Sequence, residues 1–302
     1  MKSTWKTVSW ALYAAWAVAV FLYEPPMPAG RSPGERPAAS AAAPAADHGH
    51  VTEPVSARPE KAEFPYRLAA CGRPASVEVA PMLAAITAAQ GDFNLALRPG
   101  ESDWPVGCSP FAVAVLCHHY GFPQALPRRE MAINVGGSAA AWTVGGARYP
   151  YAKGGRMAGL QPLMVDVGAL AKTEYDRSGS GTGWKNMEGA LGELGFRFGR
   201  AATLADVLAS VRHRRPALVS VTLDSWKPDE RHCAVADGIG SAGDGSAALH
   251  LRFFHRRADD GGWYSVGTDH GGGLSLHQAT VDVVPGEAPF RTVPVILAGN
   301  GP

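Results

Sequence analysis

The spacing of hydrophobic and polar positions after residue 63 changes character along the chain. Helical periodicity with stop signals predicts helices over 79–90, 109–120, 184–194 and 204–213. From residue 216 onward, β-branched and apolar runs separated by glycine-containing turns predict strands over 216–223, 233–239, 247–254 and 263–266, with further pieces near 279–284 and 293–297. Because the helices precede the strands instead of alternating with them, the pattern predicts an α+β fold and excludes a regularly alternating parallel sheet.

The N-terminal segment follows a different pattern. Lys2 and Lys6 precede an uncharged run from Thr7 to Tyr23, which is close to the lower length limit for a helix that spans a bilayer. We therefore predict a signal anchor or transmembrane helix over 1–23, with its basic end in the cytoplasm. Cleavage in the alanine-rich stretch 38–46 is the alternative. Either way, the rest of the chain is expected outside the cytoplasm, in the periplasm or, if cleaved, secreted.

Residues 24–62 are rich in proline and alanine and carry almost no large apolar side chains. Such a segment cannot bury enough surface to offset the entropy of ordering it, so it is predicted to be a disordered linker. The remaining residues, 63–302, are enough for one domain with a substantial core.

Overall composition narrows the function. The chain has 302 residues, with 28 basic and 27 acidic side chains and a formal net charge of +1. This balance argues against a nucleic-acid partner bound through bulk positive charge. The four cysteines are too few for a disulfide scaffold, although Cys71 has Cys117 or Cys233 as possible partners in an oxidising compartment. Trp142, Trp184, Trp226 and Trp263 are candidates for lining a peptide groove or for filling the core.

The strongest candidate for chemistry is Cys108. It lies in Gly107-Cys108-Ser109-Pro110, just before a predicted helix whose proline suits the first turn. Unsatisfied backbone N–H groups and the helix dipole at that position favour the thiolate, which is the nucleophilic form. A buried, inert cysteine is the alternative.

His232 is the candidate base. It opens the strand-like segment His232-Cys233-Ala234-Val235-Ala236-Asp237-Gly238. Its separation from Cys108 is similar to the ~130–150 residues between nucleophile and base in papain-type enzymes. Cys117-His118-His119 is not a comparable metal site, because consecutive helical residues point in different directions.

In this order, the segments resemble the double-glycine, bacteriocin-leader-processing cysteine peptidases and their broader papain-like relatives. The resemblance rests on GCSPFAVAVLCHHYG at 107–121, the glycine-threonine turn and helix of 181–195, the helix and strand of 203–219, and 232–238. It implies a papain-like fold with an N-terminal helical lobe and a C-terminal antiparallel sheet. It also implies catalysis by Cys108 and His232 without a metal or organic cofactor. The family's oxyanion glutamine is replaced by Ser102.

The resemblance further requires an aspartate or asparagine that holds the imidazole of His232. The turn at 241–246 places His255 opposite His232 in a hairpin, and the nearest carboxylates follow at Asp259 and Asp260, with Asp269 as a rival. We expect Asp259 to fill this role.

Together these features predict a membrane-anchored, extracytoplasmic thiol peptidase that acts on a peptide or protein. The alternative is a catalytically silent relative that binds a peptide or partner protein in the same cleft. A third possibility is another thiol reaction, such as amide transfer.

Overall fold

The computed structural model describes residues 64–83, 88–98, 100–101, 103–151, 157, 159–255, 261–266 and 273–286. The chain divides into two compact units, Met1–Pro54 and Val55–Pro302, and all described residues belong to the second. The predicted anchor at 1–23 and linker at 24–62 lie outside them. Within the described residues, no helix has the length and apolarity needed to cross a membrane.

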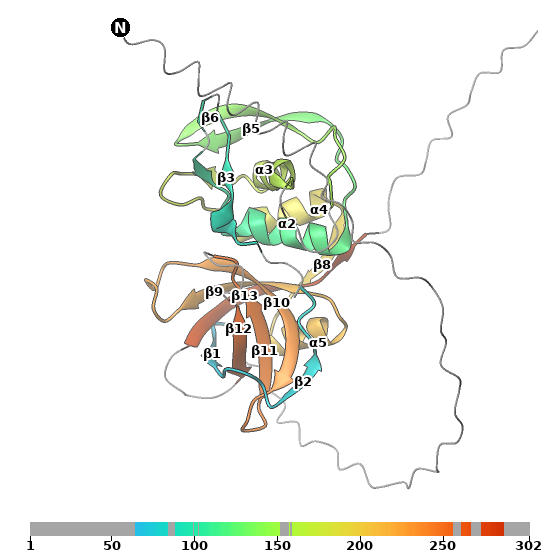
Figure 1. Ribbon diagram of the computed structural model, residues 1–302, viewed down its shortest axis with the longest axis vertical. Coiled ribbons are helices and arrows are strands. Elements are labelled where there is room, and N and C mark those ends of the chain that lie inside the picture. Colours follow the sequence, from blue (N-terminus) through green and yellow to red (C-terminus); the bar gives the residue numbers. More distant parts are fainter. Residues whose placement is uncertain are drawn as a thin grey trace, which may run out of the picture. The chain divides into compact units, whose positions relative to one another are not determined.

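An antiparallel barrel forms one side of the described unit (Figure 1). Its strands follow the order β1, β12, β11, β10, β9 and β13, and β1 also pairs with β13, which closes the barrel. These strands are β1 (Tyr66–Ala70), β9 (Ala217–Leu223), β10 (His232–Ser241), β11 (Ala247–Arg252), β12 (Gly262–Val266) and β13 (Gly273–Pro285). Two further strands attach to its rim: β2 (Ser76–Val79) pairs with β10, and β8 (Phe196–Arg200) pairs with β13.

Alternation of side chains along the strands explains why the barrel has two apolar faces. Val219 and Val221 of β9 belong to one buried cluster together with Leu249 of β11 and Leu274 of β13. Leu218, which directly precedes Val219 on β9, belongs to a second cluster that also contains buried side chains of the three helices described below. Successive residues of a strand point to opposite faces, so β9, β10 and β13 each contribute to both clusters. Helix α5 (Leu204–Arg212) packs against the first cluster.

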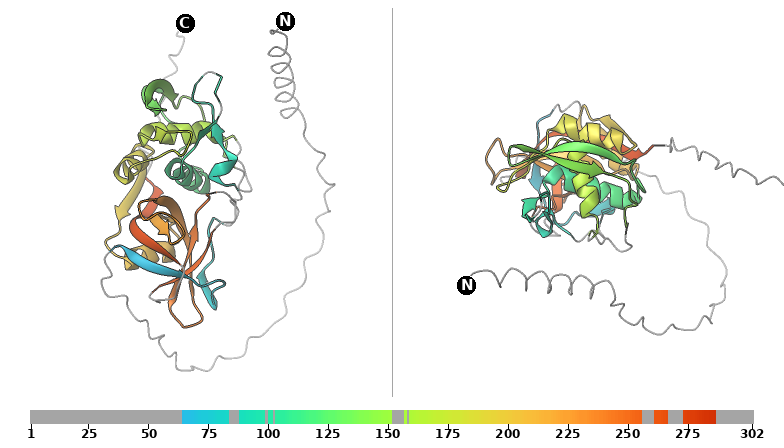
Figure 2. Two further views of the ribbon diagram at one scale, coloured as in Figure 1. Left: turned by 90° about the vertical axis from the view of Figure 1, so that its left-hand side faces the viewer. Right: turned by 90° about the horizontal axis from the view of Figure 1, so that it is seen from above.

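The other side of the unit is built around three helices, α2 (Cys108–Tyr120), α3 (Gln161–Leu170) and α4 (Trp184–Glu193). Figure 2 shows them gathered at one end of the barrel. Residues 109–117 of α2 are all buried, which makes it the central helix, and Gly121 ends it in the left-handed conformation. Short strands lie alongside: β3 (Asn94–Leu95) pairs with β4 (Trp104–Pro105), and β5 (Arg129–Val135) pairs with β6 (Ser138–Val144) and β7 (Glu174–Tyr175).

Three of the four predicted helices are confirmed to within one or two residues, but the helix predicted over 79–90 is wrong at both of its ends. Val79 is the last residue of β2, where it pairs with Ile239 of β10, and Gln90–Asp92 form a single 3₁₀ turn. Val79 and Leu83 are buried in different clusters, and residues 84–87 of the predicted helix lie outside the described residues. The sequence also missed α3, β1 and the β5–β6 hairpin.

The papain-like fold with an N-terminal helical lobe is also wrong. β1 and β2, the first described strands, belong to the antiparallel barrel sheet instead of a helical lobe. The hairpin β5–β6 separates α2 from α3, with Gly136 and Gly137 at its turn in positive-φ conformations that favour glycine. The described unit is therefore mostly antiparallel sheet with few helices. The strands predicted at 216–266 are confirmed, and the piece near 293–297 lies outside the described residues.

Candidate active site

Cys108 is the first residue of α2, and its side chain is partly exposed. Gly107 caps the helix with φ 83°, and among the described residues no capping side chain accepts a hydrogen bond from the first turn. The first backbone N–H groups of a helix have no partner within the helix, so they present donors and positive potential beside the sulfur. The helix start therefore provides a site for an anion next to Cys108.

The Cys108 thiol has a lowered pKa. Burial by itself raises this pKa, but the charge of His232 and a hydrogen bond from that side chain lower it, with smaller contributions from the Cys233 backbone N–H and the Ser109 hydroxyl. The net result is a pKa of about 7, compared with 9.0 for an ordinary thiol. Close to half of the Cys108 thiols are therefore ionised at neutral pH.

His232, the first residue of β10, is 95% buried, with an exposed fraction of 5%. Its Nε2 lies 2.5 Å from the backbone carbonyl oxygen of Phe253. A carbonyl oxygen only accepts hydrogen bonds, so Nε2 must carry the proton. This leaves Nδ1 for the hydrogen bond with Cys108, which Nδ1 accepts from the thiol when the imidazole is neutral and donates to the thiolate when it is an imidazolium.

The rings of Trp226 and His255 lie edge to face against the imidazole of His232. The Trp226 ring lies 5.5 Å from it and the His255 ring 5.4 Å, both edge to face, and Trp226 and His255 are themselves 5.4 Å apart. The ring contact confirms that His255 lies beside His232, as the predicted hairpin requires. The three rings form a cluster beside the His232–Phe253 hydrogen bond.

A glycine-rich loop, 178–183, closes in on the residue before Cys108. A Cβ atom added at Gly107 would lie 3.1 Å from the Cβ of Ser180. The Ser180 hydroxyl donates to the Pro105 carbonyl oxygen at 2.6 Å, and the Thr173 and Thr182 hydroxyls are hydrogen-bonded at 2.8 Å. This loop therefore lies against the segment that leads into α2.

The structure brings together two of the three residues proposed from the sequence. Cys108 and His232 interact, whereas Asp259 and its rivals Asp260 and Asp269 lie outside the described residues, as does Ser102. All four cysteines are free thiols, so neither suggested disulfide of Cys71 is formed. Among the described histidine, cysteine and acidic residues, no group of three or more is placed to hold a metal ion.

Sequence reasoning missed the partner of the His232 Nε2, because a backbone carbonyl leaves no residue-type signal. It also left Trp226 undistinguished from three other tryptophans. Trp142 instead donates to the buried Asp166 at 2.8 Å, and the Trp263 ring contacts His250 at 5.0 Å. The one signal for Trp226 in the sequence was its position six residues before His232, between two predicted strands.

No protein-family model and no curated protein matches the chain. Among solved structures, it is similar to the active wild-type interpain A cysteine protease of Prevotella intermedia, with a TM-score of 0.52 and 16% identity over 70% of this chain and 96% of that one. A mutant prointerpain A fragment from the same organism gives a TM-score of 0.51 and 17% identity, over 73% of this chain and 77% of that one. At such identities the similarity establishes a shared fold. The relationship to a cysteine protease is therefore structural, and it gives no specific support to the double-glycine type.

Proposed function

We propose that the chain is a thiol-dependent peptidase that cleaves peptide bonds with the pair Cys108 and His232. The observation that carries this proposal is the lowered pKa of Cys108, about 7, caused by a histidine whose tautomer is held by the Phe253 carbonyl. Structural disulfide or core cysteines have no need of such a partner. The shared fold with a cysteine protease supports the same activity.

In this mechanism the Cys108 thiolate attacks the carbonyl carbon of the scissile bond, and the carbonyl electron pair moves to the oxygen. The backbone N–H of Cys108, at the start of α2, stabilises that oxyanion. The His232 imidazolium then gives its Nδ1 proton to the leaving amine as the C–N bond breaks, which leaves a thioester on Cys108. Water, deprotonated by His232, hydrolyses the thioester and restores the free thiol.

The test is peptide cleavage together with covalent trapping. Purified protein 63–302 is incubated with a broad peptide library, and with a peptidyl chloromethyl ketone whose site of attachment is read by mass spectrometry. Cys108→Ala should reduce cleavage by at least ~10³-fold and abolish the adduct. Cys71→Ala, which removes another partly exposed thiol, is the matched control and should retain both.

The possible outcomes separate the candidate functions. Cleavage that survives Cys108→Ala would contradict the assignment of the nucleophile. Absence of cleavage and of the adduct, with peptides still retained by the wild-type protein, would favour the silent binding domain.

An extracytoplasmic, membrane-anchored location is part of this proposal and is supported by the basic and apolar pattern of residues 1–23. Full-length protein should sediment with membranes, and removal of residues 1–24 should release it. Recovery of the intact full-length chain in the cytosolic fraction would contradict the anchor.

A further inference from the structure

Trp226 is carried by the connection between β9 and β10, residues 224–231, which we call the Trp226 loop. Its indole ring lies edge to face against both His232 and His255, at 5.5 and 5.4 Å between ring centroids. The loop therefore places one of the two rings that lie edge to face against the proposed base. Whatever fixes the loop also fixes the ring beside His232.

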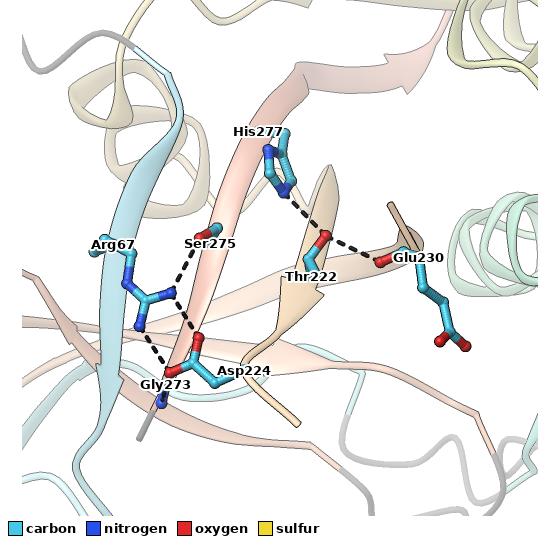
Figure 3. A network of polar contacts seen from close by, with 7 residues as sticks. All are labelled: Arg67, Thr222, Asp224, Glu230, Gly273, Ser275 and His277. Carbon is cyan, nitrogen blue, oxygen red and sulfur yellow. Dashed lines mark hydrogen bonds and ion pairs between the residues drawn. The ribbon is translucent and has the colours of Figure 1, made fainter. Parts of the chain in front are cut away.

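One end of the Trp226 loop is anchored to the first strand of the barrel. The guanidinium of Arg67 on β1 binds both carboxylate oxygens of Asp224, at 2.5 and 2.7 Å (Figure 3). Asp224 also accepts from the backbone N–H of Gly273 at 2.9 Å, and Arg67 donates to the Ser275 hydroxyl at 3.1 Å. A bidentate guanidinium–carboxylate pair fixes the relative orientation of the two side chains as well as their distance. The start of the loop is thus tied to β1 and β13 together.

The other end is anchored through Thr222, the residue before the last of β9. Its hydroxyl donates to the backbone carbonyl oxygen of Glu230 at 3.0 Å. Because that hydroxyl proton is used, the 3.0 Å contact with Nε2 of His277 requires the imidazole to donate to Thr222 (Figure 3). The Thr222 hydroxyl therefore connects Glu230, two residues before His232, to His277 of β13.

Bonds within the Trp226 loop complete its geometry. The backbone N–H of Trp226 donates to the Leu223 carbonyl oxygen, and the backbone N–H of Glu230 donates to the Lys227 carbonyl oxygen, each at 2.9 Å. Two turns between two anchors leave the backbone around the indole little freedom.

We propose that the anchors of the Trp226 loop, Arg67–Asp224 and Thr222–Glu230, hold Trp226 against His232 and thereby align its imidazole with Cys108. This inference rests on the proposed peptidase function and assigns Arg67, Asp224 and Thr222 as positioning residues. An exposed ion pair contributes little to global stability, so loss of this one alters the loop before it alters the fold. The N-terminal strand of the domain thus acts on the site through a loop far away in sequence.

The experiment measures the rate at which iodoacetamide alkylates Cys108 from pH 5 to 10, with each thiol quantified by mass spectrometry. Asp224→Asn and Thr222→Val should each shift the profile to higher pH, with alkylation at pH 7 reduced about three- to tenfold and rates converging near pH 10. Trp226→Ala should give at least the same shift. Thr222→Ser, which keeps the hydroxyl, should retain the wild-type profile. In peptide cleavage, the shifted variants should lose kcat with KM changed less than about twofold.

Glu78→Gln is the matched control, since Glu78 and Arg212 form another exposed ion pair, at 2.9 Å, away from the Trp226 loop. It should leave the alkylation profile unchanged. If Asp224→Asn and Thr222→Val, folded by circular dichroism, give profiles that superimpose on the wild type, the anchors have no positioning role. If Trp226→Ala also superimposes, the ring has none. A wild-type Cys108 that titrates like an ordinary thiol contradicts the peptidase function itself, a result that the variants do not mimic.

Discussion

Replacement of His232 by alanine tests the central pair directly. In the wild type, burial raises the pKa of Cys108, and His232 more than compensates, so that the pKa falls to about 7. His232→Ala removes the largest lowering contribution and leaves the burial in place. The pKa should then reach or exceed the ordinary value of 9.0.

The expected magnitude follows from the thiolate fraction. With a pKa of about 7, roughly half of the Cys108 thiols are ionised at pH 7, whereas a pKa of 9 leaves about 1%. The alkylation rate at pH 7 should therefore fall about 50-fold. Because a lowered pKa supplies thiolate at lower pH, the wild-type rate should rise through pH 7 and level off by about pH 8. The His232→Ala rate should rise only near pH 9.

The assay is stopped-time iodoacetamide labelling of Cys108 across this pH range. His119→Ala is the control, because His119 lies on the same helix but about 16 Å further along its axis. It should leave the profile unchanged. A His232→Ala rate at pH 7 within about twofold of the wild type would refute the reasoning, since the thiolate would then owe nothing to His232.

Three further predictions follow from the described contacts. The buried Asp166 carboxylate accepts hydrogen bonds from Trp142 at 2.8 Å and from Tyr149 at 2.6 Å. Asp166→Asn should therefore lower the free energy of unfolding, measured by urea titration, by ~2–3 kcal/mol, and a change below ~0.5 kcal/mol would contradict this. Burial raises the pKa of Cys117 far above its usual range, so this thiol should stay unlabelled at pH 8 until urea unfolds the protein, and labelling of the native protein would be inconsistent with its burial. Gly107→Ala adds a Cβ at φ 83° and 3.1 Å from the Ser180 side chain, and should reduce kcat/KM at least ~10-fold, whereas equal activity would show that the turn before the nucleophile is tolerant.

The sequence determined the parts of the site that depend on local signals. The start of α2 at Cys108 follows from the glycine before it, the proline within its first turn and an uninterrupted apolar run, all of which act over a few residues. The β10–β11 hairpin follows equally from two apolar runs around one short turn, and its register placed His255 opposite His232.

Tertiary structure decided the rest, because the partners are distant in the chain. The short segment Tyr66–Ala70 becomes β1 only because β12 and β13 offer free edges for it to pair with, and this pairing closes the barrel. Long-range pairing with Ile239 of β10 likewise makes Val79 the last residue of β2, where the local spacing predicted the first residue of a helix. At the site, the backbone carbonyl of Phe253 holds His232. Every residue has a backbone carbonyl, so the residue type at position 253 could not indicate this contact. Local patterns thus determined where the helix of Cys108 and the strand of His232 begin. Hydrogen bonds between segments far apart in the chain decided what surrounds these two residues.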